Sequence, residues 1–241
     1  MRYAILSDIH GNLEALRAVL ADARDRVDAF LCLGDIVGYG ADPEACIELV
    51  AEHCQMVVGG NHEQAVAGRI DLNWFNPYAR AAAEWTHDRL DDDQRAWLGS
   101  LPLVSEVGDA TLVHASPAYP EEWEYLVSAE DGFAAFGAFT TRLCFVGHSH
   151  LPGMWVQGSW GRGHEAGDVK VAIDPGGRYI INVGSVGQPR DHDPRAAYAL
   201  WDAEARTLAI RRVTYDLDAA RAKIVAAGLP RFLADRLAAG R

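Results

Sequence analysis

Short apolar runs that end at a polar residue recur along the first 150 residues of the chain. The first run, Arg2 to Ser7, is predicted to be a buried strand. Asn12 is expected to cap a helix that continues to about Arg24, because apolar residues recur in this segment at helical spacing. The runs Asp28 to Leu33 and Gln55 to Val58 predict two further strands on either side of a second helix.

The second helix is predicted to begin at Asp42 and Pro43, with the aspartate as its cap and the proline at its first position. The order strand, helix, strand, helix, strand indicates parallel strands joined by right-handed crossovers. After residue 150 the pattern changes to strands that tight turns separate, which indicates antiparallel pairing. These strands are expected at Met154–Gln157, Asp168–Ile173, Arg178–Asn182, Ala196–Trp201 and Thr207–Val213.

Two segments, at about residues 63–100 and 121–139, are helical in pattern and are interpreted as an inserted helical cap. Trp74, Phe75, Trp85 and Trp97 lie in the first segment. Packing inside the cap is the favoured interpretation for these aromatic residues, because large rings usually bury their area; stacking against a substrate is the alternative. The chain is therefore expected to be one domain over residues 1–241, with a glycine-rich loop at 158–167 and tail helices at 217–227 and 231–239.

Composition narrows the class of protein. The hydrophobic content of 49% is ordinary for a globular chain of 241 residues, and the net charge of −12 disfavours bulk nucleic-acid binding. The four cysteines form no Cys-x-x-Cys pair, which favours reduced, buried thiols. No basic leader precedes an apolar segment and no apolar run approaches 18 residues, so a cytoplasmic protein without a membrane span is expected.

Metal-ligating residue types follow the ends of five apolar runs. Since the carboxyl ends of parallel strands meet at one edge of a sheet, these side chains are expected to lie together. They are Asp8, His10, Asp35, Asn61, His62, His114, His148 and His150. The other four histidines lack this context and are interpreted as solvated or structural; they are His53, His87, His164 and His192.

This residue set suits two divalent ions, because oxygen and imidazole ligands together bind manganese, iron, zinc and similar metals. Two ions roughly 3.5–4 Å apart can clamp a phosphoryl group and lower the pKa of a bridging water, whose hydroxide then attacks phosphorus. Asp35 is the candidate to bridge the ions. His62, directly after Asn61, is the candidate acid for the leaving oxygen.

The motifs Asp8-Ile9-His10, Gly34-Asp35, Gly60-Asn61-His62-Glu63, His114 and Gly147-His148-Ser149-His150 occur in the order found in calcineurin-like metallophosphoesterases, which the chain therefore resembles. The later run from Asn182 to Arg190 is similar to the small stand-alone bacterial members. The resemblance implies an α/β fold that is a four-layer α/β/β/α sandwich. It also implies one metal on Asp8, His10, Asp35 and His150, and a second on Asp35, Asn61, His114 and His148.

Departures from the family pattern refine the expected substrate. Phosphoprotein phosphatases carry an Asp-Arg pair where this chain has Gly38 and Tyr39, and an arginine where it has Gly59. Without the paired arginines a dianionic monoester is neutralised less well, so phosphodiesters are the expected substrates and phosphoproteins are disfavoured. Tyr39 and Arg190 are weaker candidates for substrate contact, with packing and a solvent-facing loop position as the alternatives.

The predicted function is therefore hydrolysis of a small phosphodiester, or of a nucleotide, with two divalent ions as cofactors. Manganese is favoured, and iron, zinc, nickel, cobalt or magnesium are alternatives, since metal supply decides much of this selectivity. A dinucleoside polyphosphate or other nucleotide phosphohydrolase is the alternative activity, with the cap aromatics stacking a base. A non-catalytic metal-binding scaffold and a slow nucleotide sensor are further alternatives. An oligomer is compatible with the sequence, which does not require one.

Overall fold

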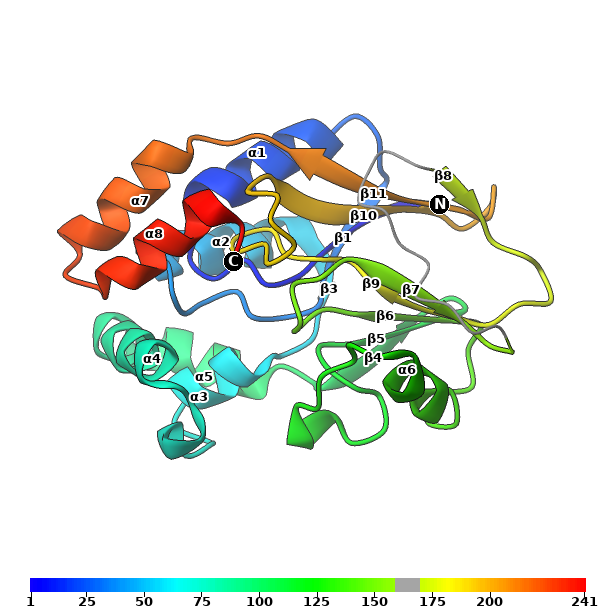
Figure 1. Cartoon of the computed structure of the whole chain (residues 1–241), viewed down its shortest axis with the longest axis horizontal. Coiled ribbons are helices and arrows are strands. Elements are labelled where there is room, and N and C mark those ends of the chain that lie inside the picture. Colours follow the sequence, from blue (N-terminus) through cyan, green and yellow to red (C-terminus); the bar gives the residue numbers. More distant parts are fainter. Residues whose placement is uncertain (159–169) are drawn as a thin grey trace.

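A computed structural model of the chain describes residues 1–158 and 170–241. Two β-sheets pack face to face, and helices cover their outer faces (Figure 1). The predicted four-layer α/β/β/α sandwich is therefore confirmed. None of the helices in the described part of the chain is long and apolar enough to cross a membrane.

The first sheet has six strands in the order β3-β2-β1-β10-β11-β8. They are β1 (Arg2–Leu6), β2 (Ala29–Cys32), β3 (Cys54–Val57), β8 (Lys170–Ala172), β10 (Ala196–Asp202) and β11 (Thr207–Val213). The strands β1, β2 and β3 are parallel, as predicted, and β10 joins β1 in antiparallel orientation. The expected strand at Asp168–Ile173 is confirmed by β8, although residues 168 and 169 lie outside the described part of the chain. The expected loop at 158–167 lies outside it except for Gly158, and His164 lies outside it as well.

The second sheet has five strands in the order β4-β5-β6-β9-β7. They are β4 (Val104–Val107), β5 (Ala110–Val113), β6 (Leu143–Val146), β7 (Gly153–Val156) and β9 (Tyr179–Asn182). The expected antiparallel arrangement after residue 150 is wrong for one side of β9, which pairs parallel with β6 and antiparallel only with β7. The alternation within a strand reports its burial but not the direction of its neighbour, so the pattern could not distinguish the two pairings.

The helices are α1 (Leu13–Ala23), α2 (Pro43–His53), α3 (Asn61–Val66), α4 (Pro77–Arg89), α5 (Asp92–Ser100), α6 (Ala129–Ala135), α7 (Leu217–Ala226) and α8 (Arg231–Ala239). Two short 3₁₀ helices, η1 (Leu72–Trp74) and η2 (Pro120–Glu122), lie between them. Asn12 caps α1 as predicted, with its Oδ1 accepting from the N–H of Ala15. Asp42 is the N-cap residue of α2 and Pro43 is at its first position, as predicted. The expected capping bond is wrong, because the Asp42 carboxylate makes none and pairs with Lys223 Nζ at 2.9 Å.

The two expected cap segments differ in helical content. The first contains α3, η1, α4 and α5, whereas the second is helical mainly at α6. A capping box between Ser128 and Asp131 starts α6, so the helix cannot begin at residue 121 as the pattern suggested. The six residues before it hold the left-handed Trp123 and connect η2 to α6.

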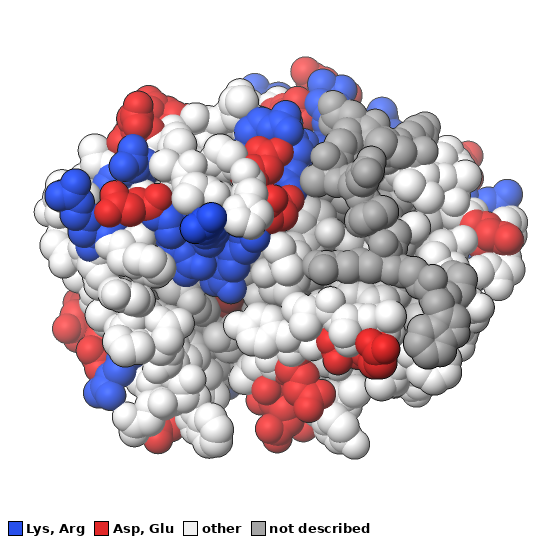
Figure 2. Space-filling view, in the orientation of Figure 1, with Lys and Arg blue, Asp and Glu red and all other residues white. Residues whose placement is uncertain are grey.

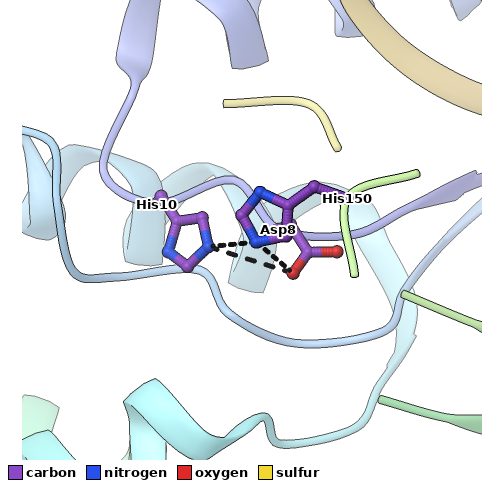
Figure 3. A group of neighbouring side chains, drawn as sticks. All are labelled: Asp8, His10 and His150. Carbon is purple, nitrogen blue, oxygen red and sulfur yellow. Dashed lines mark hydrogen bonds and ion pairs between the residues drawn. The ribbon is translucent and has the colours of Figure 1, made fainter. Parts of the chain in front are cut away.

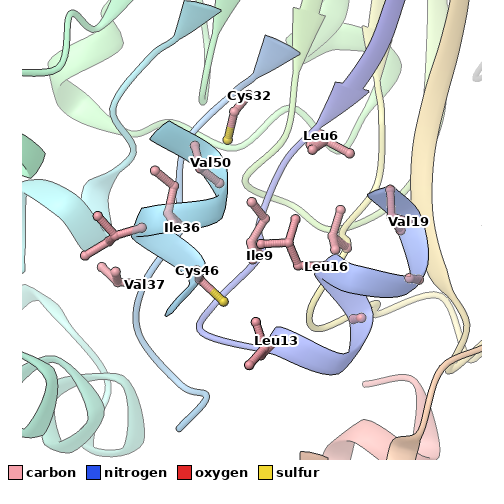
Figure 4. Close-up of a cluster of buried hydrophobic side chains, with 14 of the residues drawn as sticks. Leu6, Ile9, Leu13, Leu16, Val19, Cys32, Ile36, Val37, Cys46 and Val50 are labelled. Atoms are coloured by element: carbon pink, nitrogen blue, oxygen red, sulfur yellow. The ribbon is translucent and has the colours of Figure 1, made fainter. Parts of the chain in front are cut away.

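Three of the apolar clusters among the described residues pack the layers together. Ala4 and Leu6 of β1 face α1 and α2 in the cluster of Figure 4, while Tyr3 and Ile5 of the same strand face the second sheet. A third core packs Trp155 and neighbouring residues of the second sheet against α6. The strand β1 is thus buried on both faces, which explains why its sequence is a continuous apolar run rather than an alternating one.

Candidate metal centre

Every predicted ligand lies just beyond the carboxyl end of a strand. Asp8 and His10 follow β1, Asp35 follows β2, Asn61 and His62 begin α3 after β3, His114 follows β5, and His148 and His150 follow β6. All eight side chains are buried. The strands belong to both sheets, so the face-to-face packing of the sheets brings together residues far apart in the sequence.

The backbone at this edge is turned into an unusual conformation. Asp8, His10, Asp35, His148 and His150 have φ angles of 54°, 50°, 50°, 63° and 60°, in the left-handed region that residues with a Cβ rarely adopt. Such strained residues persist where the surrounding structure holds them, and they gather at functional sites. Here the left-handed turns point the side chains off the strand ends toward one another.

The first group contains Asp8, His10 and His150, shown in Figure 3. His10 Nε2 lies 3.1 Å from His150 Nε2, and Asp8 Oδ1 lies 3.2 Å from His150 Nε2. The remaining pair, Asp8 Oδ1 and His10 Nε2, is 3.9 Å apart. Three ligand atoms from two chain segments 140 residues apart therefore converge on one point.

The second group contains Asp35, His114 and His148. His114 Nε2 lies 3.3 Å from Asp35 Oδ2 and 3.1 Å from His148 Nδ1. The same Oδ2 atom of Asp35 is 3.6 Å from His10 Nε2 in the first group. Asp35 thus stands between the two groups, with one carboxylate oxygen near an imidazole of each.

Backbone carbonyls fix which nitrogen of three imidazoles carries the hydrogen. The Nδ1 atoms of His10, His114 and His150 lie 3.0, 2.9 and 2.5 Å from the carbonyl oxygens of Val37, Leu33 and Gln188. A carbonyl only accepts, so each Nδ1–H donates, and Nε2 is the atom that each ring directs to the interior of the site and that is unprotonated when the ring is neutral. A histidine held in this way is pre-oriented as a metal ligand.

Burial and mutual charge set the protonation of the site. Burial lowers the pKa of His10 and His150, and it lowers the pKa of His148 to about 3. Burial also disfavours the charged form of His114, but the neighbouring Asp35 carboxylate outweighs it and raises the pKa of His114 to about 9. The same charge pairing, acting against burial, holds the pKa of Asp35 well below its usual range.

The residues present fit divalent cations. In the first group two unprotonated nitrogens face each other at 3.1 Å, an arrangement in which neither can donate to the other. Asn61 Oδ1 has no hydrogen-bond partner, although the residue is only 8% exposed. A cation beside these atoms would satisfy both, and mixed carboxylate, amide and imidazole donors are the set that borderline divalent metals prefer.

Glu63, for which the sequence alone indicated no role, organises the site. Its buried carboxylate accepts from the N–H groups of Asp35, Gly60, Ile36 and Val37 at 2.7, 2.8, 2.8 and 3.3 Å. Burial, together with the Asp35 charge, raises the pKa of Glu63 to about 7. The sequence signal that could have indicated this role is the position of Glu63 directly after His62 in the motif Gly60-Asn61-His62-Glu63.

Gly60 allows the close approach of these turns. A Cβ atom at this position would lie 2.2 Å from Asp35 Oδ1, which accepts the N–H of His62 at 3.0 Å. Only glycine therefore permits Asp35 to reach between the two ligand groups while also holding the start of α3.

The end of β9 and the segment after it form hydrogen bonds with residues of the first group and with the turn before His148. Gln188 positions His150 through its carbonyl, and Ser185 Oγ donates to the carbonyl oxygen of Asp8 at 2.8 Å. Asn182 Nδ2 donates to the carbonyl oxygen of Gly147 at 2.6 Å, next to His148. The run from Asn182 to Arg190, noted in the sequence for its similarity to bacterial relatives, therefore lies against the candidate metal centre.

A cleft of about 530 Å³ opens from this centre toward solvent. Both weaker candidates line it: Tyr39 packs 4.6 Å from the ring centroid of His62, and the Arg190 guanidinium lies 6.0 Å from the Tyr39 ring. Trp74, expected in the core of the cap, instead lines the cleft and is 85% exposed. Tyr125, absent from the sequence prediction, lines it as well and stacks on His148 with ring centroids 4.1 Å apart.

The other aromatic and sulfur-containing residues follow the favoured expectations. Trp85 and Trp97 pack against buried apolar clusters and do not line the cleft. All four cysteines are free, and burial raises the pKa of the Cys32 and Cys144 thiols. His87 is structural, because its Nδ1 lies 2.7 Å from the carbonyl oxygen of Val66.

The chain is similar to known proteins over most of its length. The sequence profile of the calcineurin-like phosphoesterases matches residues 1–152. An uncharacterized protein of Methanocaldococcus jannaschii is 42% identical over 246 aligned residues, covering 99% of this chain and 98% of that protein. The crystal structure of a metallophosphoesterase from Sphaerobacter thermophilus superposes with a TM-score of 0.91 at 45% identity, covering 100% of this chain and 99% of the other. A hypothetical protein from Pyrococcus horikoshii OT3 shares the fold, with a TM-score of 0.81, 22% identity and coverage of 100% and 98%.

Proposed function

Because the chain belongs to the calcineurin-like phosphoesterase family and is thus a metal-dependent hydrolase of phosphate esters, we propose that it is a two-metal phosphodiesterase. The observation that carries this proposal is the position of Asp35 Oδ2, which is 3.6 Å from His10 Nε2 and 3.3 Å from His114 Nε2. One oxygen shared by two ligand groups is suited to bridging two ions.

The ligand sets follow from the two groups. Asp8, His10, Asp35 and His150 would hold one ion, and Asp35, Asn61, His114 and His148 the other. Two divalent ions, with manganese favoured, would supply Lewis-acid stabilisation of the phosphoryl oxygens and a nucleophile at neutral pH. The chain contributes the fixed imidazole orientations, the charge of Asp8 and Asp35, and a buried site that excludes bulk water.

In the proposed reaction the oxygen of a water molecule forms a bond to phosphorus as the ester P–O bond breaks, and a proton passes to the leaving oxygen. His62 is placed to deliver this proton, since it lines the cleft and its Nδ1 has no partner. Burial lowers the pKa of His62 to about 4, so the free protein holds the ring neutral at neutral pH. An anionic phosphoester in the cleft would favour the charged form again, because an opposite charge stabilises it.

The charge of the cleft supports a diester rather than a monoester. Arg190 is the only lysine or arginine among the described residues that line it. A phosphodiester carries one negative charge, whereas a monoester carries up to two near neutral pH and needs more positive charge around it. We propose that Arg190 contacts a phosphoryl oxygen and that Tyr39 forms the wall beside it.

A test uses metal-stripped protein titrated with Mn²⁺, with hydrolysis of bis-p-nitrophenyl phosphate measured beside p-nitrophenyl phosphate. Diester cleavage is expected to appear with bound metal and to exceed monoester cleavage. Asp35→Asn should lower the number of bound ions as well as the rate, while His62→Ala should lower the rate with metal still bound. Glu106→Gln, an exposed charge change on β4, is the control. Faster monoester cleavage would contradict the diester preference, and absence of metal binding would contradict the whole proposal.

A second candidate activity is hydrolysis of a nucleotide, including a dinucleoside polyphosphate. The observation that favours it is the exposed indole of Trp74 at the cleft, since an exposed aromatic face can stack on a base. Measuring release of product from cyclic nucleotides and dinucleoside tetraphosphates beside bis-p-nitrophenyl phosphate distinguishes the two activities.

A further inference from the structure

The outer part of the cleft carries three carboxylates. Glu121 and Glu122 of η2 line this part of the cleft, and so does Asp71, which is the N-cap residue of η1. Within the described residues no lysine or arginine forms an ion pair with Glu121, Glu122 or Asp71. The Asp71 carboxylate accepts from the backbone and side chain of Asn73, and these bonds, together with the nearby charge of Arg80, lower its pKa. Figure 2 shows acidic side chains gathered over the loop that contains η2.

Exposed aromatic side chains line the same cleft. Trp74 is 85% exposed and follows Asp71 within one turn of η1, and Tyr125 is 51% exposed and follows Glu122 by three residues. Tyr125 has one face on His148, so the stack joins the outer cleft to the candidate metal centre. Phe75 continues this apolar surface inward, with its ring centroid 5.0 Å from that of His62.

The inner end of the cleft is suited to an anionic group rather than a cationic one. Asn61 and His62 are buried there and each has a side-chain atom without a hydrogen-bond partner, Oδ1 and Nδ1 respectively. Arg190 adds the positive charge that an anionic group requires. The lining of a single cleft therefore combines an end suited to a phosphoryl group with exposed aromatic rings and carboxylates that form no ion pair with a described lysine or arginine.

Aromatic faces attract organic cations through the negative face of the ring, and neighbouring carboxylates add to this attraction. The same carboxylates repel a substrate with additional phosphates. We infer that the substrate is a zwitterionic phosphodiester in which one ester substituent is an organic cation of the alkylammonium class. This inference rests on the proposed phosphodiesterase function and specifies its substrate.

The test compares two diesters that share the p-nitrophenyl leaving group. One is p-nitrophenyl phosphorylcholine, and the other is its uncharged isostere, in which carbon replaces the quaternary nitrogen. The Mn²⁺-loaded protein is expected to show kcat/KM about tenfold higher for the cationic ester, in keeping with the usual strength of cation–aromatic recognition. The preference should fall toward unity in Glu121→Gln with Glu122→Gln, and it should weaken at high salt.

Glu106→Gln with Glu130→Gln is the matched control, because it removes the same charge from two exposed positions outside the cleft and should leave the preference unchanged. A second readout is independent of turnover: choline chloride should change the tryptophan fluorescence of the metal-free protein at lower concentration than the uncharged isosteric alcohol, and Trp74→Ala should remove this response.

The possible outcomes distinguish a failure of the cationic-substrate inference from a failure of the proposed phosphodiesterase function. Equal kcat/KM for the two diesters, with no effect of the Glu121 and Glu122 substitutions, would overturn the inference and leave the phosphodiesterase proposal standing. Faster cleavage of a nucleoside p-nitrophenyl diester than of both would also overturn it, in favour of base stacking. Failure to cleave any diester would overturn the proposed function; if choline then bound no better than the uncharged alcohol, the inference would fall with it.

Discussion

Four backbone N–H groups from two separate turns meet at the carboxylate of Glu63. One turn carries Asp35 and the other begins α3 at Asn61 and His62, so this side chain sets the relative position of three candidate site residues. A buried carboxylate can accept all four bonds because each of its oxygens accepts two. At the residue scale, therefore, a side chain outside the ligand set contributes as much to the geometry as the ligands.

Glu63→Gln should destabilise the protein strongly. A glutamine offers one oxygen and one NH₂ group, so two of the four N–H donors would face a donor, at an expected cost of about 2–4 kcal/mol in the free energy of unfolding. Urea unfolding of the metal-free protein measures this, with Glu106→Gln as the exposed control. A change below about 0.5 kcal/mol, the usual range for a surface substitution, would show that the four bonds are not needed.

Trp74 and Trp85 should behave differently although both are tryptophans of the same segment. Trp74 lines the cleft, whereas Trp85 packs against the cluster that contains Tyr39 and lies under the Arg89 guanidinium at 5.4 Å. Trp74→Ala should raise KM several-fold with Tm unchanged, and Trp85→Ala should lower Tm with KM unchanged. Steady-state kinetics and thermal unfolding of both variants check this; a raised KM in Trp85→Ala alone would contradict it.

At the scale of elements, polar contacts complement the apolar packing of α1 on the first sheet. Asp22 near the end of α1 accepts from Tyr198 of β10 at 2.6 Å and pairs with Arg211 of β11 at 3.4 Å. Burial opposes ionisation of Asp22, but these partners outweigh it and lower its pKa below the model-compound value of 3.8. The helix is thus fixed to two neighbouring strands by one carboxylate.

Asp22→Asn should make the protein less stable near neutral pH and remove part of its acid sensitivity. A carboxyl whose folded pKa is depressed stabilises the fold above its unfolded pKa, and this contribution is lost as pH falls through the folded value. The difference between wild type and variant, about 1–2 kcal/mol for the hydrogen bonds to a charged group, should therefore shrink in strong acid. Urea unfolding at several pH values measures it; a difference that grew in acid would contradict the assignment.

At the scale of the whole molecule, the candidate centre joins the two sheets. Asp8, His10 and Asp35 follow strands of the first sheet, while His114 and His150 follow strands of the second. The Asp8–His150 and Asp35–His114 pairs therefore cross the interface that the apolar core between the sheets forms. An ion bound to both members of such a pair would hold the sheets together at this edge.

Metal removal should accordingly lower stability as well as activity. A ligand that binds only the folded state stabilises it by about 2.7 kcal/mol when present at 100 times its dissociation constant. Mn²⁺ should raise Tm of chelator-treated protein, and the increase should be much smaller in Asp35→Asn. Differential scanning calorimetry of both proteins with and without Mn²⁺ tests this, with Glu106→Gln expected to respond like wild type. An equal increase in Asp35→Asn would place the stabilising ion elsewhere.

The sequence by itself determined the strand-end pattern that marks the candidate centre. A polar ligand type directly after a buried run, as at Asp35 after β2 and His148 after β6, is a local feature that can be recognised in the sequence. Parallel strands bring their carboxyl ends to one edge of a sheet, so these residues are expected to lie together. The boundaries of β11 and α8 also match the predicted segments 207–213 and 231–239, the second of which begins after the break at Gly228-Leu229-Pro230.

Only the tertiary structure decided how these parts meet. The approach of His10 to His150 spans 140 residues, and the pairing of β9 with β6 depends on strand direction, which a local pattern does not encode. The exposure of Trp74 at the cleft and the four bonds to Glu63 likewise arise where separate turns pack together. Residue type and spacing determine which ligands and hydrogen bonds a side chain can offer. The residues that it contacts are determined by the packing of segments far apart in the sequence.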